Sequence, residues 1–256
     1  MRKKLVALLA GAMLMMATSA LATPINDNRP VVPGSSSETT LDAVLKANFN
    51  NSLGVADQSN VGGWETTDGS PKAYSVAFFR GDAGSLFIYS LSDYAKEYAL
   101  LNNPGLNSVK SFGIMGVDLV DADNNVLVAN FGTSFGFYWQ DTTVANKSYT
   151  EDSRNIGGFG PANNIKALTF LVKDGTTLTG NIAAQMANNT AARTATGNDD
   201  WVIAFEDRVN GDFDFNDSVF YIKDIAPVPE PGTMMLLGIG MLGMAIYGKR
   251  RMNKEA

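Results

Sequence analysis

Short runs in which apolar and polar residues alternate constrain the fold of this chain more than any other feature. The first run, AYSVAFF, places Tyr74, Val76 and Phe78 on one side of an extended chain. Seven further runs are equally rich in β-branched and aromatic residues: SLFIYS, MGVDLV, NVLVANF, SFGFYW, KALTFLV, WVIAFE and SVFYIK. Gly, Asn and Asp separate the runs, as is typical of turns. The pattern predicts about eight strands and an all-β fold, an antiparallel β-sandwich of the jelly-roll-like kind.

One or two short helices are expected beside these strands. Apolar residues recur at helical intervals within residues 38–49, namely at Leu41, Val44, Leu45 and Phe49. Ser37 is a candidate N-cap for this helix. A second helix is predicted for SDYAKEYALLNNPG, beginning at Ser92 and ending before Pro104. Residues 183–197 fit either a poor helix or a long loop.

The N-terminus has the three parts of a secretory signal peptide at residues 1–22. The cations of MRKK come first, an apolar run from Leu5 to Ala17 follows, and small residues at Ala20 and Ala22 supply a cleavage site. The apolar run is too short to span a membrane. The sequence therefore predicts export, followed by a flexible leader at residues 23–37 that is rich in Pro, Asn and Ser.

Residues 38–226 are long enough for one domain with a hydrophobic core, and the chain contains no cysteine for disulfides. The exported part, residues 23–226, has 13 Lys and Arg against 24 Asp and Glu, a net charge of −11. Such a surface repels phosphate, so nucleic acid is not an expected partner, whereas cations are. The chain also has no histidine, which excludes a Ser-His-Asp triad and a His-rich zinc site.

The densest chemistry lies in an acidic block at residues 199–217, which holds seven carboxylates and one cation, Arg208. Asp212, Asp214 and Asn216 offer oxygen ligands on alternate residues, and Gly211 permits a turn. Ca²⁺ takes six to eight such oxygens. Six residues are the candidate ligands for Ca²⁺: Glu206, Asp207, Asp212, Asp214, Asn216 and Asp217.

This block is not an EF-hand, because Asp217 stands where that loop requires Gly and Lys223 where it requires Glu. The alternative interpretation is an acidic turn between two strands, chosen for tight backbone geometry. A similar Asp-x-Asp-x-Asn at residues 121–125 is predicted to be a plain hairpin turn.

Paired carboxylates also raise the alternative of a secreted glycan-processing enzyme. Glu206 and Asp207 are adjacent, so on a strand they point to opposite faces and cannot flank one glycosidic bond. The alternative of a catalytic partner from elsewhere in the chain, such as Glu65 or Glu151, stays open. We nevertheless expect no enzymatic activity. The tryptophans could stack on sugars, but aromatic residues in strand-like runs are more often part of the core.

The C-terminus combines a Pro-Glu-Pro motif with a short apolar segment and a basic end. Sixteen apolar residues at 233–248 would form a helix about 24 Å long, slightly short of a typical membrane core. The segment predicts a transmembrane helix that follows a linker at residues 227–232. The adjacent cations would halt transfer and keep residues 249–256 in the cytoplasm: Lys249, Arg250 and Arg251.

These three elements resemble the C-terminus of PEP-CTERM proteins of Gram-negative bacteria. The matching motif residues are Val228, Pro229, Glu230 and Pro231. The resemblance implies a sorting signal that a membrane-embedded exosortase reads and removes, after transient anchoring in the inner membrane. It also implies a destination at the cell surface or outside the cell, and an association with exopolysaccharide and biofilm. A permanently membrane-anchored adhesin is the alternative.

The acidic block is similar to a second known sequence. FEDRVNGDFDFND, residues 205–217, resembles the core of a domain of unknown function found in secreted bacterial proteins, whose members are β-rich and linked to calcium binding. Ser218 departs from the hydrophobic residue usual after the final Asp, but leaves the acidic ligands intact. With the two resemblances, the sequence predicts an exported, calcium-binding protein of the surface or extracellular matrix, which we expect to be non-enzymatic.

Overall fold

The computed structural model describes residues 29, 31, 38–67, 72–78, 83–105, 108–142, 146–158, 164–186, 193–195, 198–207, 211–228, 240 and 244. Residues Pro24–Pro227 form one compact unit. Among the described residues no helix has both the length and the apolar composition needed to cross a membrane. Several predictions lie outside the described residues and stay predictions: the signal peptide with Ala20 and Ala22, most of the leader, Pro229 to Pro231, the transmembrane helix apart from Gly240 and Met244, and Lys249 to Arg251.

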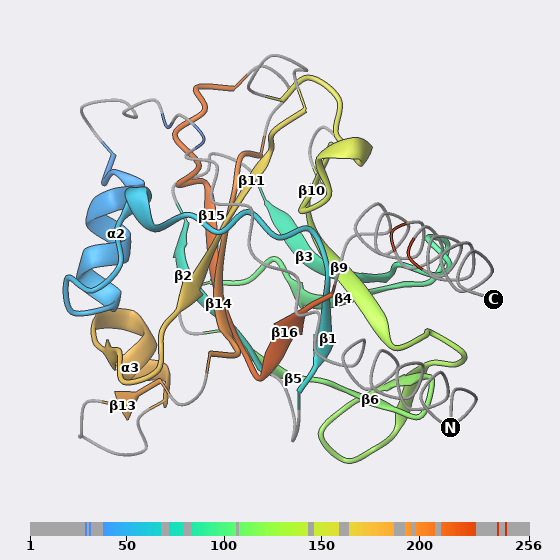
Figure 1. The fold of residues 1–256 in the computed structure, drawn as a ribbon. Coiled ribbons are helices and arrows are strands. Elements are labelled where there is room, and N and C mark those ends of the chain that lie inside the picture. The colour runs from blue at the N-terminus through green and yellow to red at the C-terminus, as the bar shows by residue number, and fades with distance from the viewer. Residues whose placement is uncertain are drawn as a thin grey trace, which may run out of the picture. The chain divides into compact units, whose positions relative to one another are not determined.

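Two antiparallel sheets make up the body, which confirms the predicted β-sandwich (Figure 1). The first has the order β16 (Ile225–Pro227), β1 (Trp64–Thr66), β9 (Ser134–Asp141), β3 (Gly84–Ser90) and β4 (Glu97–Asn102), with β10 (Lys147–Tyr149) also paired to β9. The second has the order β11 (Ala167–Val172), β14 (Asp200–Phe205), β15 (Ser218–Lys223), β2 (Lys72–Phe78) and β5 (Val109–Ser111). We call them the β9 sheet and the β14 sheet.

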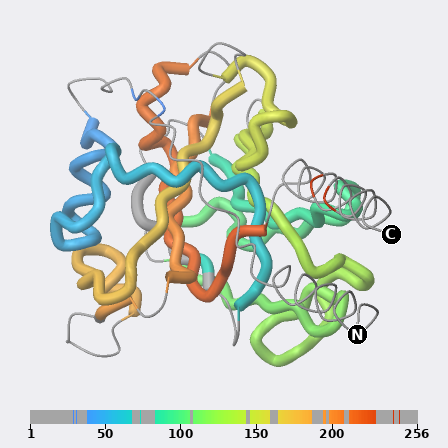
Figure 2. Tube along the Cα trace, in the orientation of Figure 1, coloured from blue at the N-terminus to red at the C-terminus, as the bar shows by residue number. Residues whose placement is uncertain are grey.

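Smaller elements complete the described fold. Three strands form a sheet of their own, β6 (Gly113–Met115), β7 (Asp118–Val120) and β8 (Val126–Val128), and β12 (Thr177–Leu178) pairs with β13 (Arg193–Thr194). The helices are α2 (Leu41–Asn48), α3 (Gly180–Met186) and the 3₁₀ turns η2 (Val55–Asp57) and η3 (Asp152–Arg154). Although far apart in sequence, α2 and α3 lie side by side (Figure 2), and the Thr179 N–H donates to the carbonyl of Asn48.

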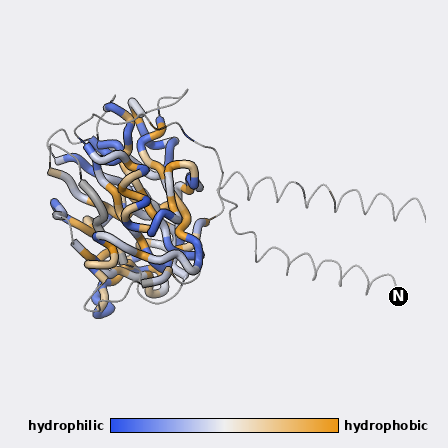
Figure 3. The backbone as a smooth tube through the Cα atoms, turned by 90° about the vertical axis from the view of Figure 1, so that its left-hand side faces the viewer, coloured by the Kyte–Doolittle hydropathy of each residue, from blue (hydrophilic) through white to orange (hydrophobic). Residues whose placement is uncertain are grey.

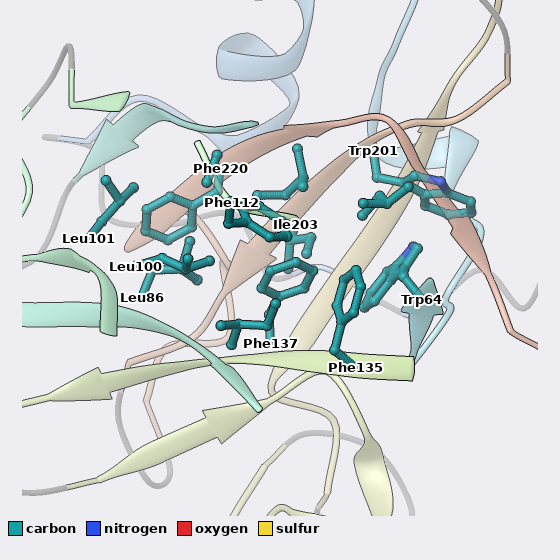
Figure 4. Packing of buried hydrophobic residues seen from close by; sticks show 14 of the residues in the cluster. Trp64, Leu86, Leu100, Leu101, Phe112, Phe135, Phe137, Trp201, Ile203 and Phe220 are labelled. Carbon is teal, nitrogen blue, oxygen red and sulfur yellow. The ribbon is translucent and has the colours of Figure 1, made fainter. Parts of the chain in front are cut away.

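Two hydrophobic cores flank the β14 sheet. Between the sheets, Trp64 of β1 contacts Trp201 of β14 with ring centroids 5.9 Å apart (Figure 4). On the opposite face, Val202 and Ala204 pack into a second core with residues of α2 and α3. Because both faces are covered, every residue of β14 is buried. Hydropathy follows this arrangement, with hydrophobic residues through the middle of the body and hydrophilic ones at its periphery (Figure 3).

The tryptophans belong to this core, as expected. Trp64, Trp139 and Trp201 each have 0% exposure, so none offers a platform for sugar stacking. Burying each ring fully contributes a few kcal/mol, which makes them structural residues.

The predicted helix from Ser92 is wrong, because residues 97–102 form strand β4 against β3. A register shift between Leu86 and Phe87 lets both Leu100 and Leu101 reach the inter-sheet core. Two adjacent inward leucines break the strand alternation that the sequence pattern relies on. Pairing with β3 therefore overrode a local helical spacing.

The helix predicted at residues 38–49 is present as α2, but its N-cap differs. The N-cap is Thr40, which has an extended backbone and whose hydroxyl accepts a hydrogen bond from the N–H of Ala43 at 3.3 Å, whereas Ser37 lies outside the described residues. The ambiguous segment at 183–197 contributes the end of α3, which begins earlier, at Gly180, and the short strand β13.

Candidate metal centre

The acidic loop, residues 206–217, joins β14 to β15. Phe205 and Ser218 pair across these strands, so the loop leaves and re-enters the sheet at facing positions. Phe213 and Phe215 have φ values of 58° and 55°, a left-handed conformation that is costly for bulky residues. Phe215 is completely buried in the helix-side core, and Phe213 packs against that core. The two phenylalanines thus anchor the loop to the helix-side core, and the side chains of Asp212 and Asp214, which alternate with them, point elsewhere.

Four carboxylates of the loop region converge. One oxygen from each of Glu206, Asp212, Asp214 and Asp217 lies within 4.8 Å of the others. Glu206 and Asp214 are 1% exposed, whereas Asp217 is half-buried and Asp212 is exposed. We call these four residues the acidic centre. It has a buried side within the protein and one carboxylate at the surface.

Three buried side-chain oxygens here make no hydrogen bond within the part of the chain that the structure describes. They are Oε2 of Glu206, Oδ2 of Asp214 and Oδ1 of Asn216. A buried oxygen without a partner costs about 1–3 kcal/mol, and more when it is charged. Two of these oxygens belong to residues of the acidic centre, Glu206 and Asp214.

The electrostatics of the centre are unfavourable without a cation. Burial, followed by the charge of Asp212, raises the pKa of Glu206 well above its usual range. Burial and the charge of Glu206 raise the pKa of Asp217 even further. Burial also raises the pKa of Asp214, to about 6, although the Asn216 N–H that it accepts opposes the shift. A divalent ion would favour the charged form of every one of these groups.

Hydrogen bonds from distant segments hold the loop in place. The hydroxyl of Ser148 in β10 donates to the carbonyl of Glu206, and Asn146 donates to the carbonyl of Asp207 at 2.9 Å. The side-chain amide of Asn216 donates to the carbonyl of Thr39, next to the N-cap of α2, at 3.1 Å. The loop therefore links the β14 sheet, the β9 sheet and α2.

The six sequence-predicted ligands are not equivalent in the structure. Four form the acidic centre, and Asn216 is completely buried, with a side-chain oxygen that makes no hydrogen bond to any residue the structure describes. The carboxylate of Asp207 lies outside the group of four, and its backbone N–H donates to Oδ2 of Asp217 at 3.0 Å. Asp207 thus positions a candidate ligand through its backbone N–H, and its own role as a ligand stays a prediction. Sequence reasoning did not identify the supporting residues Ser148 and Thr39, which carry no local signal.

Two further groups of acids differ from this centre. Asp199, Asp200 and Asp224 gather at the other end of β14 and β15, where the Tyr221 hydroxyl donates to Asp200 and Lys223 lies 3.9 Å from it. Asp200 thus has its own donor and a nearby cation, although Oδ1 of Asp199 is also buried without a partner among the described residues.

The second Asp-x-Asp-x-Asn motif, at residues 121–125, is the hairpin turn that the sequence predicts between β7 and β8. Asp121 accepts hydrogen bonds from the N–H groups of Asp123 and Asn125, both at 2.9 Å. Its carboxylate therefore serves the turn itself.

Comparison with known proteins identifies a PEP-CTERM protein-sorting motif at residues 227–251. No curated protein and no solved structure matches the chain. The motif is a PEP-CTERM sorting signal, the kind of signal that exosortase recognises, and it implies export to the cell surface or extracellular space. It begins at Pro227, the last residue of β16, which pairs with Trp64. The sorting signal thus starts where the last described strand ends.

Proposed function

We propose that this protein is a non-enzymatic component of the cell surface or extracellular matrix whose acidic centre binds Ca²⁺, and that the ion stabilises the sandwich. The observation that carries the proposal is the set of buried, unpartnered oxygens of Glu206, Asp214 and Asn216 beside a group of converging carboxylates. These oxygens have been removed from water, and no donor among the described residues reaches them. A cation is the partner that this set lacks.

The donor set favours calcium over other ions. All candidate ligands are carboxylate or amide oxygens, which suit hard cations, and the chain has neither His nor Cys to attract zinc or copper. Mg²⁺ is smaller and retains several waters, whereas Ca²⁺ accepts six to eight oxygens in irregular geometry. Glu206, Asp212, Asp214, Asp217 and Asn216 could supply most of that shell.

The position of the centre supports a structural role for the ion. The loop is bonded to β10 of the β9 sheet and to the segment before α2, so an ion that fixes the loop also fixes the junction of these layers. Binding to the native state alone stabilises it by mass action. The association with exopolysaccharide and biofilm rests on the resemblance to PEP-CTERM proteins.

Gly211→Ala tests the centre without deleting a ligand. A Cβ at position 211 would lie 1.8 Å from Oε1 of Glu206, and this buried carboxylate would have to leave the group. We expect calcium affinity, measured by titration calorimetry, to fall at least about tenfold, as for the loss of residues that position metal ligands. Gly105→Ala is the control, because a Cβ there meets no atom within 4 Å. An unchanged affinity in Gly211→Ala would remove Glu206 from the ligand set.

Replacing Pro229, Glu230 and Pro231 by alanine tests the sorting proposal. We expect the variant to accumulate at full length in the membrane fraction, while the native protein reaches the medium without residues 249–256. Mass spectrometry of the protein termini measures both outcomes. Asn253→Ala, which lies outside the matched motif, is the control and should be exported normally. Native protein that retains residues 249–256 in the membrane would instead favour the anchored adhesin.

A further inference from the structure

A buried lysine lies beside the acidic centre. Lys166 directly precedes β11, and its carbonyl accepts the N–H of Glu206 at 3.0 Å, which extends the β11–β14 ladder by one pair. Facing residues on antiparallel strands direct their side chains to the same side of the sheet. Leu168, two residues along β11, faces the helix-side core, so Lys166 and Glu206 both lie on that side.

The ammonium group of Lys166 is unusually isolated. The side chain has 0% exposure, and its Nζ makes no hydrogen bond to any described residue. A buried ammonium without partners is strongly unfavourable unless nearby negative charge compensates it. From most positions a lysine side chain reaches solvent with its amine, but the side chain of Lys166 does not.

The compensating charge comes from the acidic loop. Burial lowers the pKa of Lys166, and the carboxylates of Glu206, Asp207 and Asp217 act in the opposite direction. The buried Lys166 is therefore electrostatically coupled to carboxylates of the acidic loop.

We propose that Lys166 is the internal counter-ion of the acidic centre and that Ca²⁺ binds against its repulsion, so that this residue sets the calcium affinity. The inference rests on the proposed calcium binding. In the metal-free protein the ammonium group offsets part of the carboxylate repulsion. In the calcium-bound protein it is a like charge close to the ion. An uncharged side chain at this position should therefore tighten binding.

Lys166→Met tests the proposal, because methionine preserves the length of the side chain and removes the charge. Lys173→Met is the matched control, since Lys173 follows the other end of the same strand and is exposed. Calcium titration by calorimetry of the protein collected from the medium should give a Kd about tenfold lower for Lys166→Met, equivalent to about 1.4 kcal/mol. Lys173→Met should match the native protein.

Lys166→Gln is a second variant that keeps the test valid if Lys166→Met does not fold. Both variants are refolded in excess calcium, and their Kd is also measured by competition with a chelator. Tighter binding in either folded variant supports the proposal. Unchanged or weaker binding, or failure of both variants to fold even with calcium, overturns it. Absence of calcium binding by the native protein would be a different result, because it would overturn the proposed function itself.

Discussion

Saturating Ca²⁺ is expected to raise the melting temperature of the mature protein by about 10 °C relative to a chelator. At a calcium concentration about 1,000-fold above Kd, binding to the native state contributes about 4 kcal/mol. For a domain of about 200 residues, each kcal/mol shifts the melting temperature by about 2–4 °C. Differential scanning calorimetry in calcium and in chelator measures the shift directly.

Asp214→Asn should abolish this calcium-dependent shift. It should lower the melting temperature in calcium but not in chelator. With calcium it removes a charged ligand whose buried Oδ2 has no hydrogen-bond partner among the described residues. Without calcium it removes one of several repelling carboxylates, so the variant should melt at least as high as the native protein.

Asp123→Asn is the matched control, because it occupies the same place in the second Asp-x-Asp-x-Asn motif and its side chain is exposed. It should leave both melting temperatures unchanged. Identical melting of the native protein in calcium and chelator would show that the acidic loop is only a turn.

The stability of the metal-free protein should fall by about 3 kcal/mol or more as the pH rises from about 5 to 8. The pKa of Asp214 is raised to about 6 in the folded protein, and burial and mutual repulsion raise the pKa values of Glu206 and Asp217 further. The unfolded chain releases these protons near pH 4. Above that pH the native state therefore binds more protons than the unfolded chain does, which stabilises it. This stabilisation is lost as pH rises through the pKa values of the folded protein. These groups titrate together, so a single broad decline is expected.

Calcium should remove most of this decline, because the ion favours the ionised carboxylates and binds more tightly as pH rises. Denaturant unfolding at several pH values, with and without calcium, measures the difference. Burial also raises the pKa of Asp200 to about 6, which adds a decline of the same sign at the other end of the strands. Only the part of the decline in stability that calcium removes is therefore assigned to the acidic centre. A metal-free stability that rises between pH 5 and 8 would contradict this account.

Much of the fold could be predicted because most strands are long enough to show their composition. The runs that became β3, β9, β11, β14 and β15 were found by their β-branched and aromatic residues alone. The three-residue strands β7 and β8 lie within predicted runs, but β1, β10 and β16 do not, since so short a segment is extended only because a partner pairs with it. Strand β4 was misassigned for a related reason, because its bulge against β3 hides the alternation.

The acidic centre divides in the same way. The density of carboxylates and the alternation of Asp212, Asp214 and Asn216 were visible in the sequence, and four of the six predicted ligands do converge. That Asp207 stands apart was not visible, because its place depends on the turn that follows β14. Lys166 was not singled out, since it lies 40 positions before Glu206 in the chain and becomes its neighbour only through the β11–β14 ladder.

The amino-acid sequence by itself determined the chemistry that is local along the chain: the strand-forming composition, the oxygen donors of residues 206–217 and the sorting motif at residues 227–251. Only the tertiary structure decided which oxygens are buried without partners, and that a lysine faces them. Residue type and spacing specify what a side chain can do. Burial and long-range pairing specify its dielectric surroundings and neighbours, and these set the free energy of its charge.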